Sequence, residues 1–458
     1  MMFCRKKVIL AVLETAFLLL SCAAAPPLTV LYKPDGSPER YAGKVQPGKV
    51  MIPARYIQPA AEMRGVWIAT VENIDFPRHA DLAGFQKTIR SMFARLRAHN
   101  FNTVFFQVRP CNDAFYKSKF NPWSRYLTGK EGVAPAGTGD PLTIAIREAK
   151  NQGLQFYAWL NPYRVIGKTT INKRRYLATL APGNFARRNP HLVLDAPLPG
   201  GKHLLFLNPG EPEVVRHVVQ TVQEIAENYP VDGIVFDDYF YPYEGTGNLD
   251  ARSYVRNNPR RLPREQWRTE NVNTLIRTVR QTLQAHNRRT GQKIQFGISP
   301  FGIWANRKDH PAGSLTAGKS SLQVQHADTR MWVKQNYVDC IIPQIYWPFR
   351  HDTAAYAALA DWWAQQVRGT KVKLYIGMAP YRLGEGQWPH ASELLNQLRY
   401  NTKHPEIKGQ VMYNCNSILA PSTPAMKNAI KQLRSIYWRT QVPTASPAST
   451  RGGYPRMR

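Results

Sequence analysis

Two adjacent aspartates, Asp237 and Asp238, follow a short apolar run that begins at Val231. A pair of carboxyl groups can supply both a proton donor and a base, because two close negative charges raise the pKa of one group and keep it protonated near neutral pH. Neighbouring residues in a regular strand point to opposite faces, so the two can act together only where the strand ends. The structural alternative is an Asp-Asp pair that caps a loop. These aspartates are the candidate catalytic residues.

Polar and aromatic residues follow the other apolar runs in the same way. Aromatic faces can stack on the C–H surface of a sugar ring, while amides and charged groups hold its hydroxyls. A single Trp or Tyr at a strand end more often packs than binds, but the same chemistry at every strand end favours a carbohydrate site. The candidate substrate-binding residues are Asp75, Gln107, Arg109, Asn161, Tyr163, Arg164, Tyr239, Trp304, Asn306, Gln344, Tyr346, Trp347, Tyr381 and Asn414.

Eight apolar runs of strand length alternate with helical patterns. The clearest helical stripe consists of Leu82, Phe85, Ile89, Phe93 and Leu96. Strand and helix alternating eight times predict a (β/α)8 barrel, whose active site lies at the carboxyl ends of the strands. A doubly wound open sheet is the alternative, but no Gly-rich phosphate turn follows the first run. The predicted strands span residues 63–70, 102–108, 154–160, 231–237, 293–299, 338–346, 372–378 and 409–414.

Alternation along the fourth predicted strand assigns its two faces. Val235 and Asp237 share one face, and Ile234 and Phe236 share the other. The larger apolar pair suits contact with the surrounding helices. Asp237 is therefore expected to point into the barrel, with Asp238 at the rim.

Basic residues outnumber acidic residues by two to one. The 458-residue chain has 61 Lys and Arg against 31 Asp and Glu, a formal net charge of +30, and its 43% hydrophobic content is ample for one or two domains. Such a charge implies attraction to nucleic acid, an acidic membrane surface or an acidic polysaccharide. Many cations fall after the third and fourth strands, at Lys168, Lys173, Arg174, Arg175, Arg187, Arg188, Lys202, Arg252, Arg256, Arg260, Arg261, Arg264 and Arg268.

The N-terminus is typical of an export signal. Basic residues 5–7 precede an apolar stretch over residues 8–20. The sequence LLSC, which ends at Cys22, resembles the bacterial lipobox, in which the chain is cut before the Cys and its thiol carries lipid. By the same resemblance, Ala23 indicates the outer membrane. An ordinary signal cleaved after residues 23–25 is the alternative. Export argues against nucleic acid as the partner.

The chain divides into four predicted segments. The final residues are rich in Pro, Ser and Thr, a composition typical of disorder. The segments are a signal peptide (1–21), a tether and lead-in (22–61), the barrel (62–435) and a disordered tail (436–458).

Three cysteines remain outside the signal and the lipobox. Cys111, Cys340 and Cys415 lack the spacing of a metal site and are expected to be buried free thiols, with one disulfide as the alternative. The candidate site lacks clustered His ligands, which disfavours a zinc deacetylase. Neither a metal nor a cofactor is expected.

Several stretches together resemble the bacterial glycosyl-hydrolase-like family 10. They are MRGVWIATVENIDFP, FNTVFFQVRP, YAWLNPYR, VDGIVFDDYFYPY, GISPFGIWAN, PQIYW and GQVMYN. The family is similar to glycosidases, and its members include envelope lipoproteins that cleave peptidoglycan glycan strands stripped of peptide stems. The resemblance over residues 62–435 therefore implies hydrolysis of such strands, with a membrane anchor at Cys22. A non-catalytic glycan-binding lipoprotein and a hydrolase of another envelope polysaccharide are the alternatives.

Glycoside cleavage normally uses two carboxyl groups. They lie about 5–5.5 Å apart in retaining enzymes and roughly 6.5–9.5 Å apart in inverting ones. Attack by the N-acetyl group of the sugar itself would need no separate nucleophile. Asp237 and Asp238 are expected to form the core of the site, one of them as general acid, with Asp75 and Glu244 in reserve as the second carboxyl group.

Overall fold

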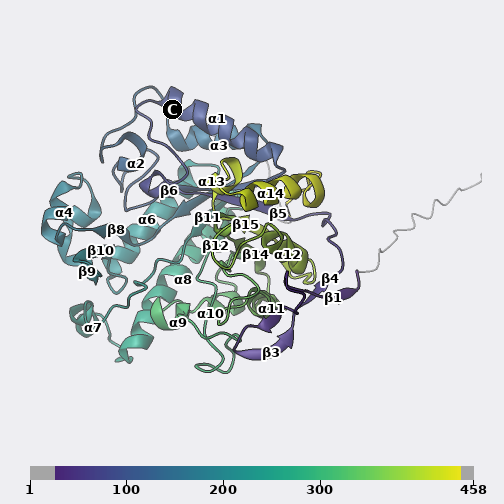
Figure 1. Cartoon of the computed structure of the whole chain (residues 1–458). Coiled ribbons are helices and arrows are strands. Elements are labelled where there is room, and N and C mark those ends of the chain that lie inside the picture. The colour runs from purple at the N-terminus through teal and green to yellow at the C-terminus, as the bar shows by residue number, and fades with distance from the viewer. Residues whose placement is uncertain (1–25, 445–458) are drawn as a thin grey trace, which may run out of the picture.

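The computed structural model describes residues 26–444, and eight parallel strands form a closed ring at its centre (Figure 1). The ring closes where β15 pairs with β5, with Val411 opposite Gly65. The predicted (β/α)8 barrel is confirmed, and every predicted strand occurs in its place. The ring strands are β5 (Met63–Ile68), β6 (Thr103–Arg109), β7 (Gln155–Leu160), β11 (Gly233–Phe236), β12 (Gln295–Ile298), β13 (Cys340–Ile341), β14 (Lys373–Met378) and β15 (Ile407–Met412).

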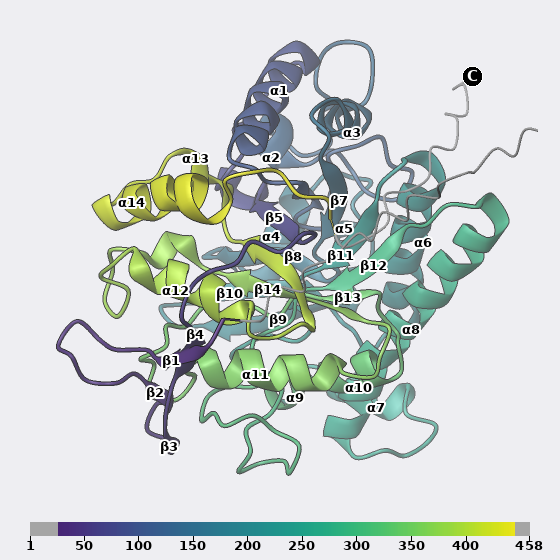
Figure 2. The same cartoon turned by 90° about the vertical axis from the view of Figure 1, so that its right-hand side faces the viewer.

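One main helix follows each ring strand and packs outside the ring, where Figure 2 shows α6 beside α8. The N-cap of α1 is Asp81, whose carboxylate accepts from Gly84 N at 2.7 Å, and α8 ends at Gly291 with φ 73°. The main helices are α1 (Leu82–Ala98), α3 (Pro141–Asn151), α6 (Pro212–Asn228), α8 (Arg264–Thr290), α10 (Thr329–Lys334), α11 (Tyr356–Val367), α12 (Ser392–Asn401) and α14 (Pro424–Gln432).

Short helical turns occupy the connections. They are η1 (Val71–Asn73), α2 (Arg125–Thr128), α4 (Lys173–Thr179), α5 (Phe185–Arg188), η2 (Pro190–Leu192), α7 (Ala251–Arg256), α9 (Ser321–Val324), η3 (Pro380–Arg382), α13 (Cys415–Leu419) and η4 (Leu433–Tyr437).

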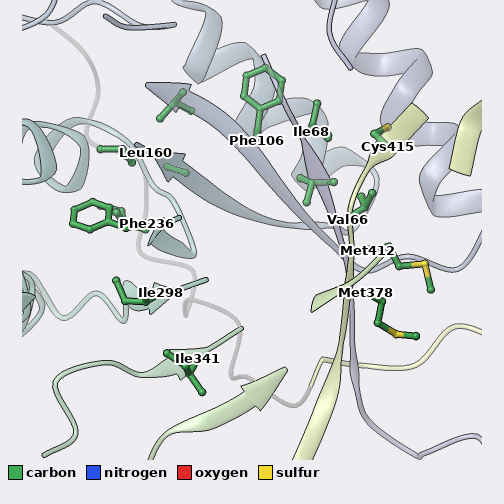
Figure 3. Packing of buried hydrophobic residues seen from close by; sticks show 14 of the residues in the cluster. Val66, Ile68, Phe106, Leu160, Phe236, Ile298, Ile341, Met378, Met412 and Cys415 are labelled. Atoms are coloured by element: carbon green, nitrogen blue, oxygen red, sulfur yellow. The ribbon is translucent and has the colours of Figure 1, made fainter. Parts of the chain in front are cut away.

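The ring has an outer and an inner apolar layer. The outer layer packs against the helices and includes the predicted α1 stripe. Figure 3 shows outer side chains from all eight strands: Val66, Phe106, Leu160, Phe236, Ile298, Ile341, Met378 and Met412. Val235 belongs instead to a separate inner cluster with Trp67, Phe105, Tyr157 and Trp159. Alternation along β11 therefore runs as expected, with Ile234 and Phe236 outside.

A glycine makes room for one of the inner rings. A Cβ atom at Gly233 would lie 2.2 Å from Cε1 of Tyr157, far inside van der Waals contact. The Tyr157 ring in turn packs against Phe105, with centroids 4.8 Å apart. The small residue on β11 thus lets aromatic side chains of β6 and β7 fill the ring.

A small antiparallel sheet interrupts the connection between β7 and α6. Its strand order is β8 (Arg164–Thr169), β10 (Lys202–Leu207), β9 (Val193–Leu198). Figure 1 shows it with α4 at the left of the ring. The connection that contains this sheet, together with α4 and α5, carries the cations that follow the third ring strand.

Folded structure extends beyond both predicted boundaries of the barrel, before residue 62 and after residue 435. The lead-in contains two two-stranded sheets, β1 (Leu28–Val30) with β4 (Met51–Pro53) and β2 (Arg40–Ala42) with β3 (Gln46–Lys49). It is fixed to the barrel by the Tyr41 hydroxyl, which donates to Asp361 Oδ2 at 3.0 Å.

The part of the predicted tail from residue 436 to 444 packs against the barrel. Trp438 is fully buried, and its ring lies 4.9 Å from the Arg64 guanidinium carbon. Arg64 Nη1 donates to Thr440 O at 2.7 Å, and Glu62 N donates to Pro443 O at 3.0 Å. The predicted tail therefore begins too early, because an apolar side chain beyond residue 435 belongs to the core.

The predicted signal and lipobox residues lie outside the described residues. Among residues 26–444, none of the helices has the length and hydrophobicity that crossing a bilayer requires. Cys111, Cys340 and Cys415 are buried free thiols, as predicted.

Candidate active site

Asp237 leaves the end of β11 toward the inside of the ring. Its residue is only 4% exposed. Trp159 Nε1 donates to Asp237 Oδ2 at 3.0 Å, and Asn161 Nδ2 lies 3.0 Å from each carboxylate oxygen. Trp159 belongs to the inner apolar cluster, so the carboxylate lies above that cluster, at the face formed by the carboxyl ends of the strands. We call this face the mouth.

Asp238 turns toward two connections on the other side of the pair. The Tyr243 hydroxyl donates to Asp238 Oδ2, and Gln325 Nε2 lies 3.4 Å from the same oxygen. Tyr243 precedes α7, and Gln325 is the C-cap of α9. Both connections therefore fix a residue that is 2% exposed.

Burial dominates the electrostatics of the pair. It raises the pKa of Asp237 to about 6, while the charge of Arg164 lowers that pKa and the charge of Asp238 raises it. Burial also raises the pKa of Asp238, against the lowering effect of the hydrogen bonds from Tyr243 and Gln325. Two acids so placed retain a proton at a higher pH than ordinary aspartates, as general acid catalysis requires.

Aromatic rings gather at the mouth. Tyr239 is 37% exposed, and the others are half-buried. Ring contacts join them in two groups. In one, the ring centroids of Tyr239 and Tyr243 lie 5.5 Å apart, and in the other, those of Tyr346 and Tyr381 lie 6.2 Å apart. The mouth aromatics are Tyr239, Tyr243, Phe301, Tyr346, Trp347, Tyr381 and Tyr413.

Several predicted binding residues instead support the scaffold. Arg109 is fully buried and donates to Asn161 O at 2.6 Å and Asn121 Oδ1 at 3.2 Å, so it fixes the main chain that carries Asn161. Trp304 is 3% exposed, donates to Asp328 Oδ1 at 3.0 Å and stacks on Trp362. These long side chains turn back from their strand ends into the protein.

Asn306, Asn414 and Tyr163 are also structural here. Asn306 is 2% exposed and donates to Gly318 O at 2.9 Å within its own loop. Asn414 is the N-cap of α13. Tyr163 is fully buried. The sequence predicts that these residues face substrate. In the structure, each side chain instead contacts other parts of the protein or is covered by them.

Asp75 and Gln107 brace the strand ends beside the pair. Asp75 accepts from Ala69 N at 2.8 Å and Asn416 N at 2.9 Å, and burial raises its pKa to about 6. Gln107 Oε1 accepts from Val71 N at 2.9 Å. Its Nε2 is buried without a protein partner.

Gln344 reaches the acid pair, whereas Glu244 has no such contact. Gln344 is half-buried and donates to Ser299 O at 2.9 Å, and its side chain also forms a hydrogen bond to Asp238 that lowers the pKa of that carboxyl group. Glu244 is exposed in the connection after β11. Neither joins the hydrogen bonds that hold Asp237.

Sequence reasoning missed Trp159, Tyr243 and Gln325. Alternation could have found Trp159, since it lies two residues before Asn161 on the same strand face. Tyr243 lies within the quoted run VDGIVFDDYFYPY. Gln325 comes from a distant connection and carries no local signal.

The comparisons identify the family. The glycosyl hydrolase-like 10 family model matches residues 62–411. The chain belongs to this family. It is 34% identical to glycosyl hydrolase DigH of Escherichia coli K12, over 92% of this chain and 94% of that protein. It is 35% identical to glycosyl hydrolase YngK of Bacillus subtilis, over 79% of this chain and 69% of that protein.

Solved structures share the fold of this glycosyl hydrolase-like barrel. The PgaB (BpsB) glycoside hydrolase domain of Bordetella bronchiseptica aligns with a TM-score of 0.52 at 13% identity, over 83% of this chain and all of that domain. Family membership and fold together place the protein among glycosidases.

The cations of the family 10 barrel fall into two kinds. Arg268 is buried and pairs with Asp250 at 2.7 Å, and Arg256 pairs with Glu211 at 2.5 Å, so part of the predicted basic surface is neutralised. Exposed cations remain in the connection after β7, at Lys168 on β8, Arg174 and Arg175 on α4, and Arg187 and Arg188 on α5.

One hollow formed by described residues lies away from the mouth and has no acidic lining. A hollow of about 480 Å³ lies outside the ring between α12 and α14, and the residues that line it include no Asp or Glu. Residues 26–444 contain no cluster of three His, Cys, Asp or Glu side chains suited to a metal ion.

Proposed function

We propose that this protein hydrolyses glycosidic bonds in peptidoglycan glycan strands that lack peptide stems. The observation that carries the proposal is the acid pair at the end of β11, buried and hydrogen-bonded at the mouth of a family 10 barrel. The mouth aromatics offer faces for stacking on sugar rings. The name of the relative DigH, a glycosyl hydrolase, supports the reaction class.

The two aspartates suit different roles. Both oxygens of Asp237 accept hydrogen bonds, from Trp159 and Asn161, which favours its charged form. The hydrogen bonds from Tyr243 and Gln325 both reach Asp238 Oδ2, and burial outweighs these bonds and raises the pKa of Asp238, which favours its protonated form. We assign Asp238 as the general acid and Asp237 as the carboxylate that orients the N-acetyl group of the substrate.

The reaction then needs no other carboxyl group. Asp238 gives its proton to the glycosidic oxygen as the bond to the anomeric carbon breaks, and the acetamido oxygen of the same sugar bonds to that carbon. Asp237 stabilises the positive charge that develops on the acetamido group. Water next attacks the anomeric carbon, the acetamido bond opens, and Asp238 takes the proton of the water.

Substitution of each aspartate tests the assignment. Asp237→Asn and Asp238→Asn should each lower the release of soluble sugars from peptide-free strands by at least about 100-fold, because the first removes the charge that stabilises the acetamido group and the second removes the general acid. Both variants should still bind the strands in a pull-down assay. Glu244→Gln is the matched control and should retain activity.

The outcomes separate the three functions. Equal product release by all three variants would refute the role of the pair. Binding without product release by the native protein would favour a glycan-binding lipoprotein. Cleavage of another envelope polysaccharide in place of peptide-free strands would favour a hydrolase of that polysaccharide. Mass spectrometry of the products identifies the bond that is cut.

Charge supports the choice of substrate. Peptide-free strands expose the lactyl carboxylate of each N-acetylmuramic acid and are therefore polyanions, and exposed cations such as Arg174 on α4 and Arg187 on α5 lie in the connection after β7. We expect KM for these strands to rise several-fold between about 50 and 300 mM NaCl, because salt screens such attraction. A KM independent of salt would contradict this contribution.

The site of action is the cell envelope in this proposal. The lipobox predicts a lipid anchor at Cys22 in the outer membrane. Cys22→Ser should move the protein from the membrane fraction to the soluble fraction and abolish incorporation of labelled palmitate. Unchanged fractionation and labelling would refute the anchor.

A further inference from the structure

The guanidinium of Arg164 is a buried charge at the mouth without an acidic partner. The residue is 7% exposed, and its guanidinium carbon lies 4.1 Å from the ring centroid of Tyr239. The Tyr239 hydroxyl is the protein acceptor in its vicinity. Within residues 26–444, no carboxylate lies within 4.0 Å of this guanidinium. Five N–H donors thus meet very few acceptors.

Two other buried arginines, Arg268 and Arg109, are held by acceptors of the protein. Arg268 donates to both carboxylate oxygens of Asp250 at 2.7 Å. Arg109 donates to the Asn161 carbonyl and to the amide oxygens of Asn112 and Asn121. A buried guanidinium without acceptors is costly, so proteins normally pair it. Arg164 departs from this pattern at the one place where a ligand can supply the missing acceptors.

The position of Arg164 connects it to the acid pair. It begins β8, three residues after Asn161, which holds Asp237. Its charge acts on both Asp237 and Asp238. On the neighbouring strand, Gln107 Nε2 is a second buried donor without a protein partner. Donors of this kind, next to acids, favour an anionic ligand group that the acids alone would repel.

A carboxylate matches these donors best. The planar guanidinium presents two parallel N–H groups, which fit the two oxygens of a carboxylate. Tyr239 lies beneath the guanidinium and is 37% exposed, so a sugar that reaches this residue at the mouth can bring its carboxylate to the edge of the Arg164 guanidinium.

We propose that Arg164 binds the carboxylate of an acidic sugar residue beside the glycosidic bond that is cleaved. This inference rests on the proposed hydrolase function and adds a specificity determinant to it. The site selects carboxylate-bearing glycans over neutral N-acetylated ones through one pre-positioned cation, in addition to the diffuse attraction of the surface.

The test compares two forms of one substrate. Peptide-free glycan strands are used with free carboxylates, and after the carboxylates are converted to methyl amides. The native protein should show a KM at least about 10-fold lower for the free form, since hydrogen bonds between charged partners contribute this much. Arg164→Gln should lose this preference, with a raised KM for the free form and little change for the amide form.

Two variants serve as controls. Arg164→Lys retains the charge and loses the two-pronged donor, so it should keep only part of the preference. Lys431→Gln removes an exposed cation on α14, outside the ring, and should keep the full preference. Circular dichroism melting curves verify that each variant is folded.

The outcomes distinguish the two proposals. Cleavage of both forms by the native protein with equal KM overturns the role of Arg164 and leaves the hydrolase function intact. An Arg164→Gln variant that loses both forms equally also overturns it, because Arg164 would then only support Tyr239 and Asp237. Failure of the native protein to cleave either form overturns the hydrolase function itself.

Discussion

At the scale of single residues, Asp237 lowers the stability of the fold on which its chemistry depends. Burial raises its pKa from 3.8 to about 6. The unfolded chain loses this proton near pH 3.8, whereas the folded protein retains it up to about pH 6. The contribution of the group to stability is therefore full below pH 3.8, falls as the pH rises through this window, and is lost above pH 6.

Asp237→Asn should consequently stabilise the protein at neutral pH. The difference of about two pKa units corresponds to about 3 kcal/mol in the free energy of unfolding at pH 7.5, and to almost nothing below pH 3.8. Thermal melting of the native protein and the variant at both pH values measures this difference. An equal effect at the two pH values would contradict the raised pKa.

The indole of Trp159 should influence the pH dependence of activity. Its hydrogen bond to Asp237 favours the charged carboxylate, so Trp159→Phe should raise the pKa of Asp237. In the proposed mechanism Asp237 acts as a carboxylate, so the acidic limb of kcat/KM should move to higher pH. Trp304→Phe, which loses a hydrogen bond to Asp328, should leave that limb in place.

The sequence predicts which face of a strand a side chain points to better than it predicts which partner that side chain contacts. Two-residue alternation places Asp237 inside the ring, and the structure agrees. Arg109 and Trp304 follow ring strands as well, yet both turn back and bond to neighbouring loops. Their length allows either arrangement, and the partners that decide between them, Asn121 and Asp328, are far from the strand ends in sequence.

At the scale of elements, the ring depends on which residues are small. Gly233 faces Tyr157, and a Cβ atom there would lie 2.2 Å from the ring. Gly233→Ala should therefore lower the free energy of unfolding by about 1–3 kcal/mol through overpacking. Gly167→Ala on β8 is the control, since nothing lies within 4 Å of that Cβ position.

A double substitution tests the cause. Tyr157→Ala removes the ring that Gly233→Ala strikes, so the two changes together should destabilise the protein by less than the sum of their separate effects. Additive losses in melting experiments would indicate that backbone preference, not the Tyr157 ring, requires glycine at this position.

Ring strands were predictable because they are buried on both faces and appear as continuous apolar runs. The strands β8, β9 and β10 form an antiparallel sheet in which buried and exposed residues are mixed, so the sequence contains no continuous apolar run of full strand length for them. The same holds for β1 to β4. Their pairing depends on partners elsewhere in the chain, which local patterns do not record.

At the scale of the whole molecule, the start of the first ring strand meets the last described residues at the face opposite the mouth. Asn102 Nδ2 bonds to both Glu62 O at 2.9 Å and Val442 O at 3.1 Å. A chain that ends at residue 436 loses Trp438 and these contacts, and should be less stable than a chain that ends at residue 444 by at least about 3 kcal/mol. Urea unfolding of the two proteins measures the loss, and equal midpoints would show that residues 437–444 are dispensable.

The folded structure begins close in sequence to Cys22, which bears on the proposed membrane anchor. Strand β1 begins at Leu28, only six residues beyond Cys22. Fully stretched, six residues span about 20 Å. Under the proposed acylation of Cys22, this short linker would hold the near side of the barrel close to the bilayer surface, and the proposed hydrolysis would be confined to glycan strands within reach of a barrel held there.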